Sequence, residues 1–122
     1  MRTRGLRFFT VYGPWGRPDM VYFKMMTSAI SQNPFPFFGD GNIERDFTYI
    51  DDVVEITCEL YSDLQKKENA FYDVVNIGGG KPISINQMLS TIEKITGQVI
   101  PYERISAIKE DVLRTNLSLI HI

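Results

Sequence analysis

The sequence has one cysteine and one histidine among its 122 residues. The single Cys58 excludes a disulfide within the chain. Neither Cys58 nor His121 has a second residue of its kind with which to build a multi-cysteine or multi-histidine metal site. We therefore expect no metal in this protein.

An excess of charge of one sign and a long hydrophobic run are also missing. Thirteen Lys and Arg against fifteen Asp and Glu give a formal net charge of -2, which provides no overall basic field to attract nucleic acid or anionic lipid. No apolar run approaches the roughly 18 residues of a membrane span, and the first residues lack the apolar segment of a signal peptide. We expect a cytoplasmic protein without nucleic-acid or membrane partners.

The residues that are present have the composition of a soluble globular protein. Hydrophobic residues make up 43% of the chain and charged residues 23%, and the length suits one core and not two. The chain has no internal repeat and no linker rich in Pro, Gly or Ser. We therefore expect one core of α/β class.

Local patterns predict alternating strands and helices. β-branched and aromatic residues between turn residues indicate the strands, and apolar residues at three- and four-residue spacing indicate the helices. The stretch 39–42 is typical of a turn, so its flanking strands are predicted to form a hairpin or a looped pair. The expected strands are 6–11, 35–38, 45–50, 72–77 and 98–103, and the expected helices are 20–32, 52–65 and 85–96.

The helices carry further signals. Ser84 followed by Gln87 forms a capping box, and Gly97 suits a left-handed C-terminal cap. In the helix 52–65, Cys58 falls on the predicted buried face and is expected to be a small core residue. The spacing in the helix 20–32 predicts a buried face made of Met20, Phe23, Met26, Thr27 and Ile30.

Several polar groups have both a structural and a chemical interpretation. Gly78–Gly80 lacks the spacing and the Lys-Ser/Thr ending of a phosphate-binding loop, so we interpret it as a turn. Asp51 is expected to cap a helix, with Asp52 in its first turn, rather than to form a catalytic pair. Arg45 can present paired donors to a phosphate or pair with Asp46, and the residues alone leave both open.

Aromatic and loop residues offer further candidates for binding. Phe35, Phe37 and Phe38 suit either base stacking or the core, with the core favoured. Thr10 and Arg17 bracket a loop after a predicted strand, the usual place for ligands in α/β proteins. The chain has no Tyr-x-x-x-Lys pair, which a hydride-transfer enzyme of the short-chain type would need.

Three segments together resemble one family. They are GLRFFTVYGPWGRPDM at 5–20, RDFTYIDDVV at 45–54, and NIGG at 76–79 followed by Ser84 and Ile85. In this order they are similar to signatures of the NAD-dependent nucleotide-sugar epimerases and dehydratases, which are extended short-chain dehydrogenase/reductases. The branch most similar to this chain epimerises UDP-glucuronate at C4.

The resemblance implies where the chain belongs in the family fold. The glycine-rich NAD loop, the catalytic Ser or Thr and the Tyr-x-x-x-Lys pair of the family all precede the strand that opens this chain. Residues 1–115 are then expected to form the end of a Rossmann-like parallel sheet plus the smaller α/β substrate-binding domain, without the N-terminal cofactor domain. The atypical tail 116–122 is interpreted as a truncation or frame-shift product.

Seven binding residues are carried over from the family by position, and no catalytic residue is among them. The resemblance assigns Phe8 and Phe9 to the nicotinamide end of NAD, Thr10 to the hexose, Arg17 to the sugar carboxylate, Pro36 and Phe38 to the uracil, and Arg45 to the diphosphate. A pair with Asp19 is the alternative for Arg17. Ile108 stands where the family usually has a further arginine for the diphosphate.

The function implied by the resemblance is interconversion of UDP-glucuronate and UDP-galacturonate by transient hydride transfer, in polysaccharide biosynthesis. Alternatives are a neutral or N-acetylated UDP-hexose 4-epimerase, a nucleotide-sugar 4,6-dehydratase, or a binding or interaction module without catalysis. The intact enzyme would use NAD, whereas this chain alone is expected to be inactive and to retain none. Because the strand 6–11 would lack its sheet neighbours, it is expected at an exposed edge that joins two chains in a homo-oligomer or a strand-swapped dimer.

Overall fold

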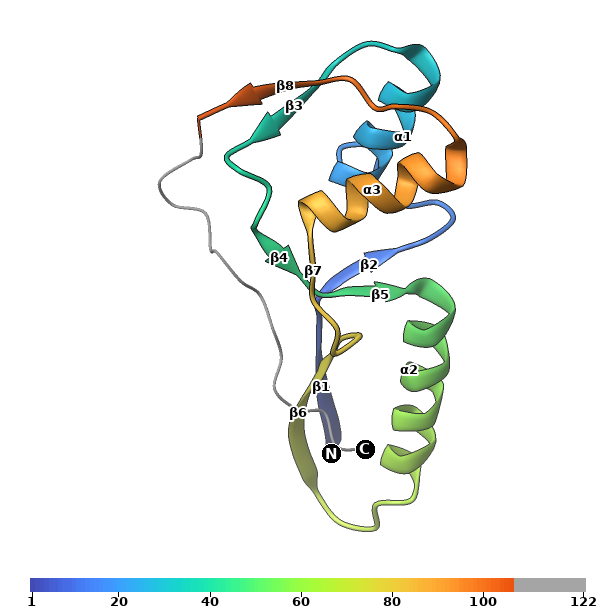
Figure 1. The fold of residues 1–122 in the computed structure, drawn as a ribbon. Coiled ribbons are helices and arrows are strands. Elements are labelled where there is room, and N and C mark those ends of the chain that lie inside the picture. The colour runs from blue at the N-terminus through green and yellow to red at the C-terminus, as the bar shows by residue number, and fades with distance from the viewer. Residues whose placement is uncertain (107–122) are drawn as a thin grey trace. The chain divides into compact units, whose positions relative to one another are not determined.

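The structure, a computed structural model, describes residues 1–106. These residues divide into two compact units, 1–14 with 46–81 and 15–45 with 82–106. Each unit has buried apolar residues of its own, so the prediction of one core is wrong. The elements in Figure 1 are β1 (Arg2–Phe8), β2 (Thr10–Tyr12), α1 (Val21–Ser31), β3 (Phe35–Phe38), β4 (Glu44–Arg45), β5 (Phe47–Tyr49), α2 (Ile50–Gln65), β6 (Phe71–Ile77), β7 (Ile83–Ser84), α3 (Ile85–Thr96) and β8 (Tyr102–Ile105).

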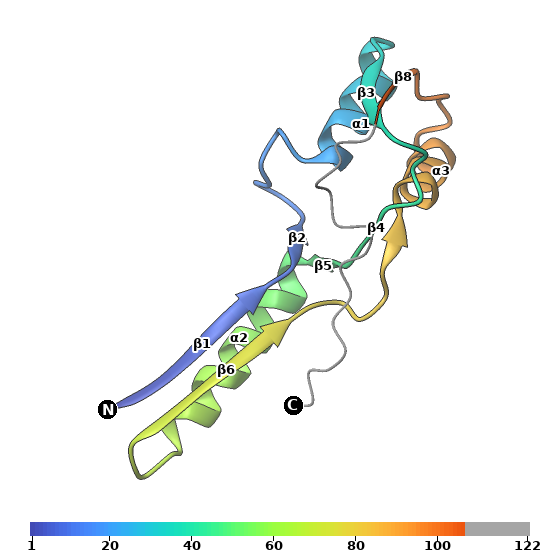
Figure 2. The same cartoon turned by 90° about the vertical axis from the view of Figure 1, so that its left-hand side faces the viewer.

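The first unit contains two pairs of parallel strands, β1 with β6 and β2 with β5, and the helix α2. Figure 2 shows β1 and β6 side by side with α2 beside them. Apolar residues at helical spacing on α2 meet the alternate residues of the strands that point toward it. The resulting core consists of Val53, Leu60 and Ile77, with Leu6, Val11, Ile56 and Val75 packed against it. The α/β class is confirmed.

The predicted strand 6–11 is divided in two at Phe9. The backbone N–H of Phe9 donates to the carbonyl oxygen of Ile77 at 3.0 Å, and the chain then enters β2, which pairs in parallel with β5. The strand β3 pairs in parallel with β8, and β4 pairs with β7 in the antiparallel sense. The predicted hairpin across 39–42 is therefore wrong, because each strand that flanks the turn takes a partner far away in the sequence.

Two expectations for α2 are wrong, that Asp51 caps the helix and that Cys58 lies in the core. Tyr49 is the N-cap of the helix, and Asp51 and Asp52 lie in its first turn without a side-chain cap. Their charges suit the positive end of the helix dipole. The stripe that faces the strands contains Val53 and Leu60, and Cys58 points elsewhere and is exposed. The prediction that Cys58 belongs to the core is wrong.

The second unit packs α1 against α3 and adds the parallel strands β3 and β8. The predicted buried face of α1 is wrong, since Met26 is 44% exposed and Ile30 is 82% exposed. Ser28 is buried instead, and its hydroxyl donates to the carbonyl oxygens of Asn33 and Pro101. The buried apolar residues of this unit are Met25, Ala29, Phe35, Phe37, Met88 and Ile100.

The cap signals of α3 are confirmed. The Ser84 hydroxyl accepts from the backbone N–H of Gln87 at 3.1 Å, and the Gln87 side chain accepts from the backbone N–H of Ser84 at 2.8 Å. Gly97 ends the helix with a φ of 67°. None of the helices within residues 1–106 has the length and apolarity to cross a membrane.

Candidate functional site

The glycine turn after β6 is held by a carboxylate of the chain itself. The backbone N–H groups of Gly79 and Gly80 donate to the two carboxylate oxygens of Asp46 at 3.0 and 2.9 Å. Asp46 has no exposed surface. The amides that a phosphate loop would offer are thus used within the protein, as expected for a structural turn.

Three of the predicted site residues follow one another at the carboxyl end of β1. Phe8 is the last residue of that strand and is 48% exposed. Phe9 forms the break, and Thr10 opens β2 opposite Phe47 of β5. Both Phe9 and Thr10 are half-buried. The carboxyl ends of parallel strands are where open α/β sheets bind their ligands, so the first unit presents this trio at a suitable end.

The aromatic segment of β3 divides into a buried pair and an exposed pair. Phe35 and Phe37 are 5% and 2% exposed and belong to the core. Pro36 and Phe38 alternate with them and lie on the exposed face, where Phe38 is 42% exposed. The two residues that the resemblance assigns to uracil are therefore the two that β3 leaves accessible.

Arg17 lies in the loop before α1 and is paired with Asp19. Its Nε donates to Asp19 Oδ1 at 3.0 Å, and Nη2 donates to Oδ2. Both side chains are largely exposed. The hydrogen bonds lower the pKa of Asp19 and raise the pKa of Arg17 from their ordinary values. The structure thus contains the pair of Arg17 with Asp19, which the sequence offered as the alternative to binding the sugar carboxylate.

Arg45 occupies the end of β4. Its backbone pairs with Ile83 of β7, and its Nη1 donates to the carbonyl oxygen of Glu44 at 3.0 Å. The residue is half-buried. Asp46, which the sequence left open as its ion-pair partner, directs both carboxylate oxygens to the glycine amides described above.

The seven predicted residues thus form two sets. Phe8, Phe9 and Thr10 belong to the first unit, and Arg17, Pro36, Phe38 and Arg45 belong to three different segments of the second. Ile108 and the tail 116–122 lie outside the described residues.

The sequence did not reveal two features near these sets. Asp46 was considered only as a partner for Arg45, because its glycine contacts lie 33 and 34 residues away. Arg104 on β8 places its guanidinium carbon 5.0 Å from the centre of the Phe37 ring and donates to the carbonyl oxygen of Gly39. The predicted strand 98–103 ended just before it.

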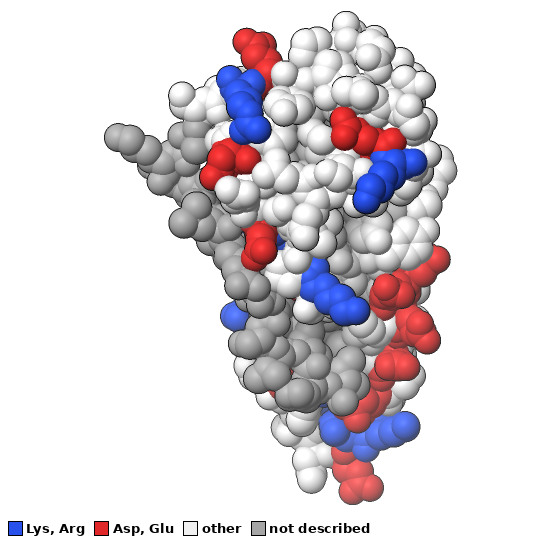
Figure 3. Space-filling view, in the orientation of Figure 1, with Lys and Arg blue, Asp and Glu red and all other residues white. Residues whose placement is uncertain are grey.

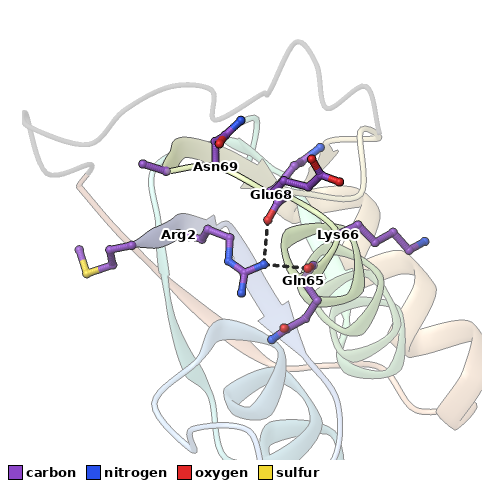
Figure 4. Close-up of a pocket in the computed structure, with 8 residues that line it drawn as sticks. Arg2, Gln65, Lys66, Glu68 and Asn69 are labelled. Carbon is purple, nitrogen blue, oxygen red and sulfur yellow. Dashed lines mark hydrogen bonds between the residues drawn. The ribbon is translucent and has the colours of Figure 1, made fainter.

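A polar pocket of about 630 Å³ opens at the amino end of β1, away from Phe8 (Figure 4). Arg2 lies in it and donates from Nη1 to the carbonyl oxygens of Gln65 and Lys67, both at 2.8 Å. Because Arg2 and Phe8 are the two ends of one strand, this pocket is separate from the trio at the carboxyl end of β1.

The charged residues give no further candidate on the face that Figure 3 shows. Acidic side chains gather there along α2, and the exposed acidic residues of that helix are Asp51, Asp52, Glu55 and Glu59. The basic side chains on this face are scattered. Within residues 1–106, no group of three or more His, Cys, Asp or Glu side chains is arranged to hold a metal ion.

Known proteins resemble this chain over nearly all of its length. The profile of the NAD dependent epimerase/dehydratase family matches residues 1–78. The chain belongs to this family. The family assignment agrees with the three sequence segments and with the parallel strand pairs, so the resemblance seen in the sequence is confirmed.

Its relatives include several UDP-glucuronate 4-epimerases. A probable UDP-glucuronate 4-epimerase of Rhizobium meliloti is 39% identical over 127 residues, covering 93% of this chain and 37% of the relative. The UDP-glucuronate 4-epimerase of Thermodesulfobacterium geofontis is 43% identical over 108 residues, covering 88% of this chain and 32% of the relative. The chain thus spans about a third of the length of these family members.

A solved structure of a UDP-glucuronic acid 4-epimerase is also similar to this chain. The UDP-glucuronic acid 4-epimerase of Bacillus cereus in complex with UDP-glucuronic acid and NAD matches with a TM-score of 0.80 and 37% identity. The match covers 93% of this chain and 35% of the Bacillus cereus protein.

A dinucleotide makes different demands at its two ends, and Phe8 and the glycine turn can be compared with them. Phe8 offers an exposed aromatic surface for a nicotinamide ring. The pyrophosphate requires free backbone amides in a G-x-G-x-x-G loop. The sequence has no such loop, and the amides of Gly79 and Gly80 are bonded to Asp46. The Gly79–Gly80 turn is therefore not available to a pyrophosphate.

Proposed function

We propose that this chain is the substrate-binding part of an NAD-dependent UDP-sugar epimerase that interconverts UDP-glucuronate and UDP-galacturonate. The observation that carries the proposal is that Pro36 and Phe38 are accessible, whereas their neighbours Phe35 and Phe37 are buried in the core. Family membership and the names of the relatives support the same activity.

The residues of the second unit suit the nucleotide. The flat apolar surface of Pro36 and Phe38 would contact uracil, since bases stack on aromatic faces with little dependence on sequence. Arg45 would grip the diphosphate, because a planar guanidinium presents paired donors to phosphate oxygens.

The residues near the sugar would orient it. The Thr10 hydroxyl would hydrogen-bond the hexose, and Arg17 would exchange Asp19 for the sugar carboxylate. A carboxylate that enters a pocket without a partner is strongly destabilised, so a uronate needs a cation at this position. NAD bound in the intact enzyme would supply the hydride chemistry at C4. This chain would hold the sugar in place for that step.

The Arg17–Asp19 pair favours a second candidate, a neutral UDP-hexose 4-epimerase. A neutral sugar needs no cation at C6, and Arg17 would then keep its partner Asp19. The cytoplasmic location, the role in polysaccharide biosynthesis, the inactivity of the chain alone and its failure to retain NAD stay predictions.

The complete reading frame that encodes this chain provides the test. Its protein product should convert UDP-glucuronate to UDP-galacturonate, which nuclear magnetic resonance of the anomeric protons distinguishes. Conversion of UDP-glucose without conversion of UDP-glucuronate would establish the second candidate and contradict the first.

A further inference from the structure

We propose that Asp46 is a positioning residue that holds Arg45 in place for the diphosphate of a uridine nucleotide. The proposal rests on the function proposed above, because it takes Arg45 as the diphosphate ligand. Asp46 itself touches no substrate in this account, since its side chain is completely buried.

The carboxylate of Asp46 is completely buried. A carboxylate removed from water is strongly destabilised unless hydrogen bonds compensate it. Here each oxygen of Asp46 accepts one backbone N–H, from Gly79 at 3.0 Å and from Gly80 at 2.9 Å. The two bonds tie the residue that follows β4 to the turn that precedes β7.

Gly79 packs tightly against Asp46, and Gly80 has a backbone conformation that favours glycine. A Cβ atom on Gly79 would lie 2.7 Å from the carbonyl oxygen of Phe47 and 3.0 Å from Oδ1 of Asp46. Gly80 has a φ of 71°, a backbone conformation that residues other than glycine adopt only at a cost in free energy. The turn therefore leaves Asp46 little room to move.

Arg45 is the last residue of β4, which pairs with β7, and it directly precedes Asp46. Arg45 is joined to Asp46 by a peptide bond, and its backbone pairs with Ile83, three residues after Gly80. The strand pair thus fixes the backbone of Arg45, and the two carboxylate bonds fix Asp46, the next residue in the chain. A bidentate contact between guanidinium and phosphate depends on position, and a shift of about 1 Å is enough to weaken such a contact severely.

The test compares UDP with uridine, which lacks the phosphates. In the 122-residue chain, Asp46→Asn keeps the size of the side chain and replaces one acceptor oxygen by a donor. We expect it to weaken UDP binding about tenfold, the effect of losing one good charge-assisted hydrogen bond, and to leave uridine binding unchanged. Arg45→Ala should show the same selectivity. The control Asp52→Asn makes the same chemical change at an exposed position and should change the affinity for neither UDP nor uridine.

Other outcomes separate this inference from the proposed function. If Asp46→Asn weakens UDP and uridine equally, or affects neither, while Arg45→Ala weakens UDP alone, the positioning role is wrong and the proposed function stands. If the unaltered chain binds neither ligand, both are wrong.

Folding of each variant is checked by circular dichroism. Where Asp46→Asn does not fold, Gly79→Ala is measured instead, because it displaces the carboxylate and leaves its charge. Loss of folding in both variants would show a purely structural role and overturn the proposal.

Discussion

Arg4 and Asp73 face each other across the parallel strands β1 and β6 and form a bidentate ion pair, with Nε–Oδ1 and Nη2–Oδ2 distances of 2.7 and 2.9 Å. The Arg4 side chain is only 8% exposed. Its Nη1 also donates to Asp63 and to the carbonyl oxygen of Leu60, both on α2. One guanidinium thus links β1, β6 and α2.

Replacing this group should destabilise the first unit. Arg4→Met keeps much of the side-chain volume and removes every donor, so we expect the free energy of unfolding to fall by about 1.5–3 kcal/mol, the range for hydrogen bonds to charged groups. Urea denaturation, monitored through the amide signals of β6, measures this change in the free energy of unfolding. Arg17→Met removes an exposed ion pair and is the control, with no expected change. A similar effect of both variants would contradict the account.

The same cluster should make stability depend on pH. The hydrogen bond from Arg4 and, secondly, that from Lys67 hold the pKa of Asp63 below its usual value. A carboxylate with a lowered folded-state pKa stabilises the fold above its unfolded pKa of about 3.9, and this contribution is lost as the pH falls through the folded-state pKa.

Asp63→Asn provides the measurement. The urea midpoint of the unaltered chain should exceed that of Asp63→Asn at about pH 7, and the difference should shrink at about pH 2.5, which lies below the unfolded-state pKa of about 3.9. A difference of the same size at both pH values would show that the charge of Asp63 is not involved.

The strand β1 should join chains together. Among the strands of residues 1–106 it pairs only with β6, and a strand edge with unused backbone groups recruits other strands. We expect dimers in sedimentation velocity as the concentration rises. Thr3→Lys adds a charge to an exposed position of β1 and should reduce them. A monomer over the whole concentration range would exclude association through this edge.

Arg17 should determine which sugar the intact enzyme accepts. If the sugar carboxylate displaces Asp19, Arg17→Ala should lower kcat/KM for UDP-glucuronate much more than for UDP-glucose, because only the acid loses its cation. Steady-state assays of the complete protein compare the two. Equal losses for both sugars would assign Arg17 to the loop pair with Asp19 and favour the neutral hexose.

Local signals were readable from the sequence, and long-range partners were not. The capping box of Ser84 and Gln87 depends on residues three positions apart, and the structure contains it as predicted. The buried face of α1 was misjudged because Ser28 is buried through hydrogen bonds, one of them to Pro101, 73 residues away. Hydrophobic spacing cannot register such a bond.

In the candidate site, too, local features were predictable from the sequence and long-range partners were not. The alternation of β3 separates Phe37 from Phe38 by the period of a strand, and the family segments supplied the assignment of the exposed residues. The carboxylate of Asp46 finds its partners 33 and 34 residues later. Sequence neighbours therefore suggested only Arg45 as its partner.

Titration calorimetry of the 122-residue chain with UDP tests most sharply whether the chain binds a nucleotide through Arg45. We expect weak binding, and we expect Arg45→Ala to reduce the binding free energy by about 1.5–3 kcal/mol, the range for hydrogen bonds to a charged group. Equal affinity of the unaltered chain and Arg45→Ala for UDP would contradict the assignment of Arg45 to the diphosphate, and no binding of UDP by the unaltered chain would contradict the claim that this chain carries the nucleotide-binding surface.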